Sequence, residues 1–246
     1  MAEVEKTLVL TGASRGIGHA TVKRFSAAGW RVITVSRQAF SEDCPWEGGA
    51  ESHVQIDLAD RAGLPNAIQN LRRRLASGRL DALVNNAGIS PKGADGQRLG
   101  SLDTDIDTWQ TVFDVNFFAP LLLARGMVEE LRTAKGSVVN VTSIAGSRVH
   151  PFAGAAYATA KAALAALTRE MAHDFGPLGI RVNAIAPGEI DTAILSPGTE
   201  EIVEREIPLR RLGRPEEVAA TIYFLCSPPS SYVNGAEIHI NGGQHV

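Results

Sequence analysis

The strongest constraint on the fold is a regular alternation of short apolar runs with longer stretches of helical period. Runs rich in Val, Ile and Leu predict strands at 6–10, 31–35, 52–56, 82–85, 137–141, 181–185 and 236–240. The stretches between them predict helices at 16–28, 61–77, 105–118, 120–133, 154–175, 193–206 and 215–226. Apolar strands joined by crossover helices require a parallel sheet covered on both faces. We therefore expect an α/β fold with a doubly wound parallel sheet of about seven strands.

Two long connections depart from this pattern. Segment 38–50 contains Pro45, Gly48 and Gly49 and has no helical period, so the crossover between the second and third strands is expected to lack a full helix. Segment 91–103 is polar and glycine-rich, and loops of that length in a compact domain are usually functional. The sequence shows no internal repeat and no linker, which predicts one domain over residues 1–246.

Composition disfavours several classes of protein. The chain has 24 Lys and Arg against 27 Asp and Glu, and this net charge of -3 disfavours a nucleic-acid partner. The longest apolar runs are far shorter than the ~20 residues of a membrane helix, and the acidic N-terminal stretch shows no secretion signal. The two cysteines, Cys44 and Cys226, have no metal-binding spacing. We expect a cytoplasmic protein in a reducing compartment, with no disulfide and no membrane partner.

A glycine-rich turn follows the first predicted strand and opens the first predicted helix. It reads Thr11-Gly12-Ala13-Ser14-Arg15-Gly16-Ile17-Gly18. Glycines permit a tight turn and close backbone approach, so amide N–H groups and the positive end of the helix can meet a pyrophosphate. An ordinary loop is the alternative, but the position between a strand and a helix favours a dinucleotide site.

Tyr157 and Lys161 lie four residues apart in predicted helix 154–175, and so share one face of it. A tyrosine with its ordinary pKa of ~10 is a poor acid or base at neutral pH. A positive charge ~4 Å away, at an effective dielectric constant of ~20, contributes about 4 kcal/mol, equivalent to about 3 pKa units. We expect Lys161 to lower the pKa of Tyr157 and make it a working proton donor.

Ser143 ends the fifth predicted strand, fourteen residues before Tyr157. Ligands of open α/β sheets bind beyond the carboxyl ends of the strands, where this hydroxyl emerges. Its predicted role is a hydrogen bond to a substrate oxygen, which stabilises the negative charge that develops there. A serine that merely forms a turn is the alternative.

These features resemble the short-chain dehydrogenase/reductase family, in particular its NADP-preferring, 3-oxoacyl-carrier-protein-reductase-like branch. The glycine spacing G-x-x-x-G-x-G matches, and so do the motifs after the third, fourth and sixth strands: Asp57-Leu58, Asn85-Asn86-Ala87-Gly88 and Pro187-Gly188. The resemblance runs from Thr11 to Gly243. It implies a single-domain Rossmann-like fold and a homotetramer or homodimer. It also implies a catalytic set of Asn116, Ser143, Tyr157 and Lys161.

The resemblance further implies roles for individual residues. Asp57 would contact the adenine, residues 86–88 the adenosine ribose, and Thr192 the nicotinamide carboxamide. Asn116 would hold a water of the proton relay. The full set of expected cofactor contacts is Gly12, Ser14, Arg15, Gly16, Ile17, Gly18, Ser36, Arg37, Asp57, Leu58, Asn86, Ala87, Gly88, Tyr157, Lys161, Pro187, Gly188, Ile190 and Thr192.

Charge at the end of the second strand indicates which dinucleotide binds. A free 2′-hydroxyl is usually held there by an acid, whereas a 2′-phosphate needs cations. The strand ends with Ser36 and Arg37, without an acid, and Arg15 lies in the glycine turn. Two arginines can form a fork around one phosphate. We expect NADP (NADPH), with NAD as the alternative.

The predicted function is reduction of a ketone or aldehyde by NADPH, or oxidation of the matching secondary alcohol. Tyr157 would protonate the oxygen, Ser143 would hold it, and Lys161 would bind the nicotinamide ribose and tune the phenol. Alternatives are an NAD-dependent sugar, polyol or hydroxysteroid dehydrogenase, and a non-catalytic dinucleotide-binding sensor.

The substrate is less constrained. Leu178 and Ala134 stand where carrier-protein reductases are expected to have arginines, so recognition of an acyl-carrier protein stays open. Glu189 follows Pro187-Gly188, which suggests either a polar or cationic substrate or an outward-facing turn residue. The histidines show no metal-binding pattern and are expected in surface, loop or tail positions at 150, 173 and 245.

Overall fold

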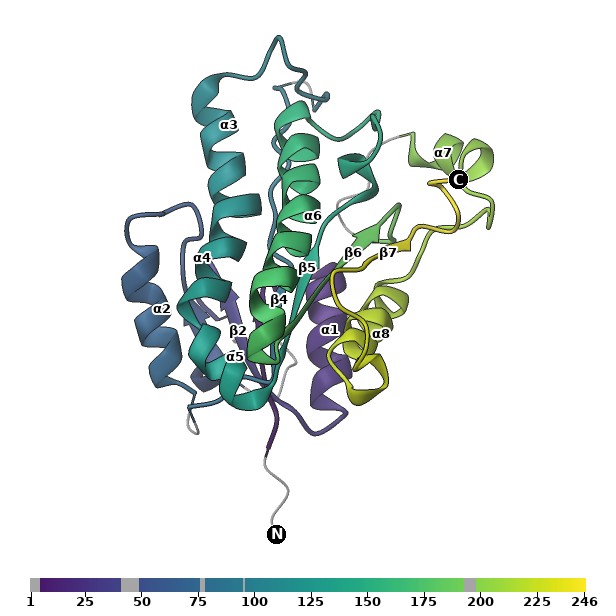
Figure 1. Cartoon of the computed structure of the whole chain (residues 1–246). Helices are drawn as coiled ribbons and strands as arrows, with labels where there is room; N and C mark the ends of the chain where they lie inside the picture. Colours follow the sequence, from purple (N-terminus) through teal and green to yellow (C-terminus); the bar gives the residue numbers. More distant parts are fainter. Residues whose placement is uncertain (1–4, 41–48, 76–77, 95, 193–197) are drawn as a thin grey trace.

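The computed structural model describes residues 5–40, 49–75, 78–94, 96–192 and 198–246 (Figure 1). Within these residues a seven-stranded sheet has the order β3-β2-β1-β4-β5-β6-β7, and each neighbouring pair is parallel. The strands are β1 (Thr7–Thr11), β2 (Arg31–Ser36), β3 (His53–Gln55), β4 (Ala82–Asn85), β5 (Ser137–Val141), β6 (Arg181–Pro187) and β7 (Glu237–Ile240). Each predicted strand is confirmed, and the doubly wound parallel sheet with it.

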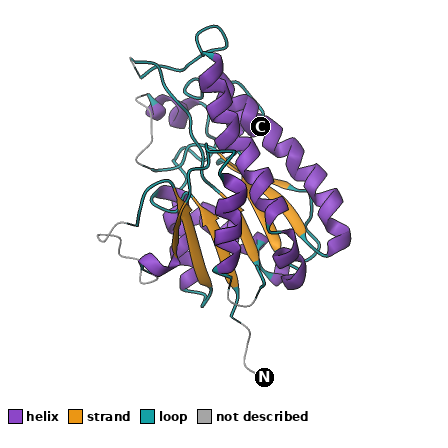
Figure 2. Cartoon of the chain, turned by 90° about the vertical axis from the view of Figure 1, so that its left-hand side faces the viewer, coloured by secondary structure: helices purple, strands orange, loops and turns teal. Residues whose placement is uncertain are grey.

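Helices cover both faces of the sheet (Figures 1 and 2). One buried cluster joins the sheet to α1 (Gly16–Ser26) and α8 (Pro215–Leu225). The other joins it to α2 (Leu64–Arg73), α4 (Ala119–Gly126), α5 (Val128–Ala134) and α6 (Ala155–Phe175). The central strands β1, β4 and β5 are buried along their whole length, as expected for a sheet covered on both sides.

One long helix differs from the prediction of two helices at 105–118 and 120–133. α3 (Ile106–Phe113) continues through a π-helical turn, Asp114–Phe118, directly into α4, and the break falls at Met127 instead. Pro120 has no N–H to donate and would crowd the carbonyl of Asn116 in a regular helix. The wider π turn, in which Ala119 N donates to Asp114 O, accommodates this proline.

Other boundaries follow local chemistry. α2 begins at Leu64, three residues later than predicted, because Pro65 favours the first turn of a helix. α7 (Thr199–Arg205) is the described part of predicted helix 193–206, since residues 193–197 lie outside the described ranges. Most of the connection 38–50 also lies outside them. In the described part of loop 91–103, an antiparallel bridge joins Lys92 and Arg98.

Among the described residues, no single helix is both long enough and apolar enough to span a membrane. Ile106–Gly126 and Val128–Ala134 meet both criteria only when taken together, and the two segments are bent by 60° relative to each other.

A chain of buried amides fixes α6 to the sheet. Asn85 Nδ2 donates to Asn140 Oδ1 over 2.8 Å, and Asn140 Nδ2 donates to Thr168 Oγ1 over 2.9 Å. Asn140 is fully buried, and the other two side chains are nearly so. Because buried polar groups are costly without partners, this chain fixes how the long helix lies along β4 and β5.

We predict that Asn140→Ala lowers the free energy of unfolding by about 2–3 kcal/mol, because the buried Asn85 amide loses its acceptor and a small cavity forms. Urea denaturation measures the effect. Asn70→Ala is the control, since Asn70 is exposed on α2 and, among the described residues, its side chain hydrogen-bonds only to Arg73. Equal effects of the two substitutions would contradict the role assigned to the buried chain.

Candidate active site

The glycine turn is locked against the turn that follows β4. Asn86 Nδ2 donates to the carbonyl oxygens of Thr11 (3.0 Å) and Gly12 (2.8 Å). In return, Thr11 Oγ1 accepts from the N–H groups of Asn86 (3.1 Å) and Ala87 (3.0 Å). These four hydrogen bonds join the carboxyl ends of two adjacent strands. The role of Thr11 is missing from the sequence interpretation.

Gly12 and Gly18 must be glycines because other backbone atoms approach them too closely for a side chain. Gly12 has φ +72°, and a methyl group there would lie 2.8 Å from Ala87 Cα. A methyl group on Gly18 would lie 2.0 Å from the carbonyl oxygen of Gly12. Neither position can accept a side chain without moving backbone, so the turn brings its main chain close to whatever lies above it.

The start of α1 is suited to an anion. The helix begins at Gly16. Its first turn has no side-chain cap among the described residues and contains no acidic residue. Its first N–H groups, next to the exposed Ser14 and Arg15, therefore present partial positive charge. This chemistry fits the pyrophosphate of a dinucleotide.

Arg15 and Arg37 are both exposed at this edge of the sheet. In the described parts of the chain neither guanidinium forms a salt bridge or hydrogen bond. Ser36 is already engaged, since its hydroxyl donates to Gln38 O over 2.8 Å and lies 3.4 Å from His53 Nε2. Both arginines therefore have N–H donors available for a ligand at the end of β2 and in the glycine turn.

The remaining predicted contact residues lie along the same edge. Asp57 is exposed after β3 and accepts from Ala59 N over 2.9 Å, whereas the Leu58 side chain belongs to the core. Leu58 thus presents only its backbone to a ligand. Thr192 lies beside the glycine turn, because a methyl group on Gly16 would be 3.0 Å from its Cγ2.

The turn after β6 is packed tightly. A methyl group on Gly188 would lie 2.6 Å from Asn241 Cβ and 2.8 Å from Gln244 Oε1. Pro187 and Ile190 are buried on either side of it. The turn is therefore supported from behind by the C-terminal residues.

The predicted catalytic residues gather at the carboxyl ends of β4 and β5. Tyr157, on α6, interacts with Ser143, which follows β5 and whose hydroxyl acts to lower the pKa of the phenol. Lys161 Nζ lies 5.7 Å from the centre of the Tyr157 ring and donates to Val141 O over 2.6 Å. A methyl group on Gly88 would lie 3.4 Å from that Nζ, which places the lysine against the turn after β4.

Asn116 lies in the π-helical turn and is fully buried. Its Oδ1 accepts from Ile89 N (2.9 Å) and its Nδ2 donates to Ile89 O (2.8 Å). A methyl group on Gly88 would lie 3.1 Å from Asn116 Oδ1, so the amide borders the same turn as Lys161. In this structure Asn116 holds the chain after β4, a contact that the sequence does not indicate.

The predicted direction of the Tyr157 pKa shift is wrong. Burial raises the pKa of Tyr157, the hydrogen bond with Ser143 partly offsets that rise, and the negative charge of Glu189 adds to it. Burial also lowers the pKa of Lys161 to about 8. The expected fall is absent because the ammonium group points at the Val141 carbonyl and because burial disfavours the phenolate.

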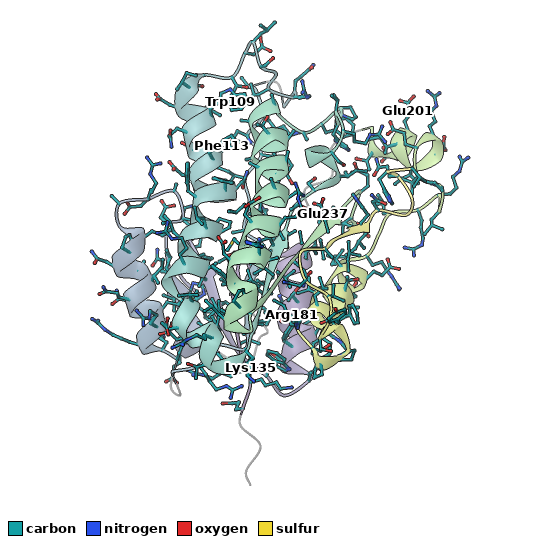
Figure 3. The ribbon with its side chains drawn as sticks, viewed as in Figure 1. Trp109, Phe113, Lys135, Arg181, Glu201 and Glu237 are labelled. Atoms are coloured by element: carbon teal, nitrogen blue, oxygen red, sulfur yellow. The ribbon has the colours of Figure 1, made fainter. Side chains whose placement is uncertain are left out.

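An apolar pocket adjoins Tyr157 between α3, α6 and loop 91–103. Its lining residues are Pro91, Leu99, Thr104, Thr108, Val112, Gly154, Ala156 and Tyr157. Trp109 and Phe113 stack on each other on α3, next to α6 (Figure 3). Like Tyr157, they pack against a small buried cluster of Val112, Ala156 and Ala160. Loop 91–103 therefore forms part of the wall next to the phenol.

His150 lies in a loop, which is one of the expected positions, but it is not at the surface. It is buried, and its Nε2 lies 2.6 Å from Glu189 Oε1. Glu189 is likewise only 11% exposed at its side chain, which overturns its interpretation as an outward-facing turn residue. His173 and His245 are exposed, as predicted.

The described ranges contain no candidate metal site and one free thiol. No group of three or more His, Cys, Asp or Glu side chains there is arranged to hold a metal ion. Cys226 is a buried free thiol, and Cys44 lies outside those ranges.

The chain is similar to known proteins over nearly its whole length. A family model described as Enoyl-(Acyl carrier protein) reductase matches residues 12–245. Protein FixR of Bradyrhizobium diazoefficiens is 64% identical over 98% of this chain and 87% of its own length. A 3-oxoacyl-(acyl-carrier-protein) reductase of Aquifex aeolicus is 34% identical over 97% of this chain and 96% of its own. The chain belongs to the short-chain dehydrogenase/reductase family.

A solved member of the family is also similar throughout. The oxidoreductase from Brucella ovis in complex with a partially ordered NAD is 64% identical, with a TM-score of 0.84, over 96% of this chain and 100% of that one. The protein is an oxidoreductase of this family, resembling its 3-oxoacyl-carrier-protein-reductase-like branch, and acts on CH–OH or C=O groups of small molecules with a nicotinamide dinucleotide.

We predict that Gly12→Ala destabilises the protein more than Gly29→Ala, by about 1–3 kcal/mol. Both glycines have positive φ, so both substitutions strain the backbone, but a methyl group on Gly29 meets nothing within 4 Å. Thermal or urea denaturation gives the difference. Equal losses would show that the contact between Gly12 and Ala87 does not constrain the turn.

Proposed function

We propose that the protein is an NADP(H)-dependent reductase of a ketone or aldehyde that also oxidises the matching secondary alcohol. The observation that carries this proposal is the position of Tyr157, whose ring centre lies 5.7 Å from Lys161 Nζ and whose phenol interacts with Ser143, at the sheet edge that carries the glycine turn. A phenol and a hydroxyl that converge here can both reach one substrate oxygen.

The bound dinucleotide supplies a hydride to the carbonyl carbon. Ser143 donates a hydrogen bond to the carbonyl oxygen and stabilises the charge that develops there. Tyr157 donates its phenolic proton to that oxygen. The raised pKa of Tyr157 suits this direction, because the phenol stays protonated at neutral pH.

Lys161 and Asn116 prepare the site. Lys161 would hold the nicotinamide ribose, and its ammonium group would restore the proton that Tyr157 gives up. Asn116 holds both backbone groups of Ile89 and so fixes the turn after β4 against the lysine. We assign the other cofactor contacts to the residues predicted from the sequence, which lie in the turns at the carboxyl ends of the strands, from residues 12–18 to Thr192.

NADP is favoured over NAD by charge. Arg15 and Arg37 offer two exposed guanidinium groups, and β2 ends without the acid that would bind a free 2′-hydroxyl. NAD is the second candidate, because the Brucella ovis relative was solved with NAD.

The protein is proposed to act in the cytoplasm as a homotetramer or homodimer. Ala162 and Ala166 leave an exposed small-residue face on α6, which suits close packing of a second copy. A non-catalytic dinucleotide sensor is the less favoured alternative, because binding alone gives no use for Tyr157, Ser143 and Lys161 together.

We predict that Tyr157→Phe lowers kcat for carbonyl reduction at least about 100-fold and leaves the Kd for NADPH within about threefold. Tyr232→Phe makes the same change on a fully exposed side chain and should alter neither. The assay follows NADPH consumption with acyl-thioester, sugar-like, steroid and small keto substrates, with NADH as the competing cofactor. A Tyr157→Phe variant of full activity would contradict the proton-donor role, and equal use of NADH would contradict the cofactor assignment.

We further predict that kcat/KM for reduction falls as pH rises through about 8. Lys161, with its pKa lowered to about 8, is charged below that pH and loses its proton above it, while the phenol keeps its own. Lys161→Arg, whose guanidinium stays charged, should show no fall near this pH in its residual activity. A wild-type profile that is flat up to about pH 10 would exclude a need for the charged lysine.

A further inference from the structure

His150 and Glu189 form a buried acid–imidazole pair that the proposed chemistry does not use. The Nε2–Oε1 distance is 2.6 Å, and the two side chains are 9% and 11% exposed. The residues are 39 positions apart in the sequence and come from separate connections, the one between β5 and α6 and the one after β6.

The hydrogen bonds of the pair define its protons. Phe152 N donates to His150 Nδ1 over 3.3 Å, so that nitrogen acts as the acceptor. The ring hydrogen then lies on Nε2, which donates to the Glu189 carboxylate. In this arrangement the imidazole is neutral and the pair keeps the negative charge of the carboxylate.

The pair lies beside the reaction site. Phe152 contacts His150 and also accepts a hydrogen bond from Lys92 of loop 91–103. That loop and Tyr157 line the same pocket, and the negative charge of Glu189 contributes to the raised pKa of Tyr157. The carboxylate is not needed to stabilise the turn after β6, because a backbone hydrogen bond does so: Gly213 N donates to Glu189 O over 2.9 Å.

His150 lies in segment 148–153, which forms a wall that is held by hydrogen bonds on both sides. Arg148 donates to Gln244 O and to Glu206 Oε2, each over 2.9 Å. From the other side Lys92 donates to Phe152 O, and Arg98 Nε donates to Ala153 O over 2.7 Å. A wall fixed in this way can hold the imidazole, and through it the carboxylate, in one orientation.

The Glu189 carboxylate has acceptor capacity that the described residues leave unused. An ionised carboxylate accepts about four hydrogen bonds, and among the described residues His150 supplies the one made to Glu189. A ligand that brings a hydrogen-bond donor can use this remaining capacity. Lys92 already brings a positive charge to this side, so a neutral donor fits better than a second cation.

We propose that Glu189 is a specificity-determining residue that accepts a hydrogen bond from a hydroxyl group next to the reacting carbonyl, and that His150 is its positioning residue. This inference rests on the proposed function and narrows it. The substrate class is a hydroxy ketone or hydroxy aldehyde, rather than an apolar ketone or an acyl thioester.

The test compares three substrates of equal size: hydroxyacetone, butanone and aminoacetone, each with NADPH. Wild-type kcat/KM for hydroxyacetone should exceed that for butanone at least about tenfold. Glu189→Leu should remove the preference. Any change that Glu189 makes in the acidity of Tyr157 affects all three substrates alike, so the ratio isolates recognition. His150→Gln should raise KM for hydroxyacetone with little change in kcat, and the exposed His173→Gln should change nothing.

Each outcome is decisive. Equal rates for hydroxyacetone and butanone, or a ratio unchanged by Glu189→Leu, would overturn the inference and leave the proposed reductase function standing. A preference for aminoacetone over hydroxyacetone would overturn the assignment of a neutral donor. Tight NADPH binding without turnover of any carbonyl compound would instead contradict the proposed function, and the inference with it.

Discussion

The contact between the turns after β1 and β4 is the constraint on which the site depends. Gly12 can approach Ala87 only without a side chain, and Asn86 and Thr11 exchange hydrogen bonds across the same junction. The junction fixes where the start of α1 points and where Gly88 lies. Gly88 in turn borders Asn116 and Lys161, so the phosphate-binding turn and the proton-transfer residues share one backbone framework.

Burial then decides the chemistry of the side chains. Removing Lys161 from water costs free energy, which its hydrogen bond to Val141 O partly offsets. Removing Tyr157 from water keeps its proton in place. The π-helical turn around Asn116 also shapes the site. It lets one long helix accept Pro120 and still place the buried Asn116 amide against Ile89. Local departures from regular structure thus lie where the site needs them.

The sequence predicted the repetitive parts of the molecule well. Apolar runs such as 137–141 located the strands, because a doubly covered parallel sheet leaves little other choice of residue. The glycine turn and the Tyr157–Lys161 pair could also be recognised in the sequence, since each depends on residue spacing within one segment. The continuous helix through Pro120 was not predicted, because a proline normally ends a helix and the π turn that absorbs it has no simple sequence pattern.

The errors at the site have a common physical cause. The direction of the Tyr157 pKa shift depends on burial and on where the Lys161 ammonium points, and neither follows from a four-residue spacing. His150 and Glu189 meet only after two distant connections fold together, and each residue looks ordinary in its own segment. Long-range pairing of this kind is visible only in three dimensions.

Isotope transfer tests the central claim most directly. The protein would be incubated with a carbonyl substrate and NADPH that carries deuterium at the transferable position of the nicotinamide ring. The account predicts an alcohol with one deuterium on the carbinol carbon and a solvent-exchangeable hydrogen on its oxygen. An alcohol without deuterium at that carbon, or loss of deuterium from the cofactor without alcohol formation, would contradict direct hydride transfer at this site.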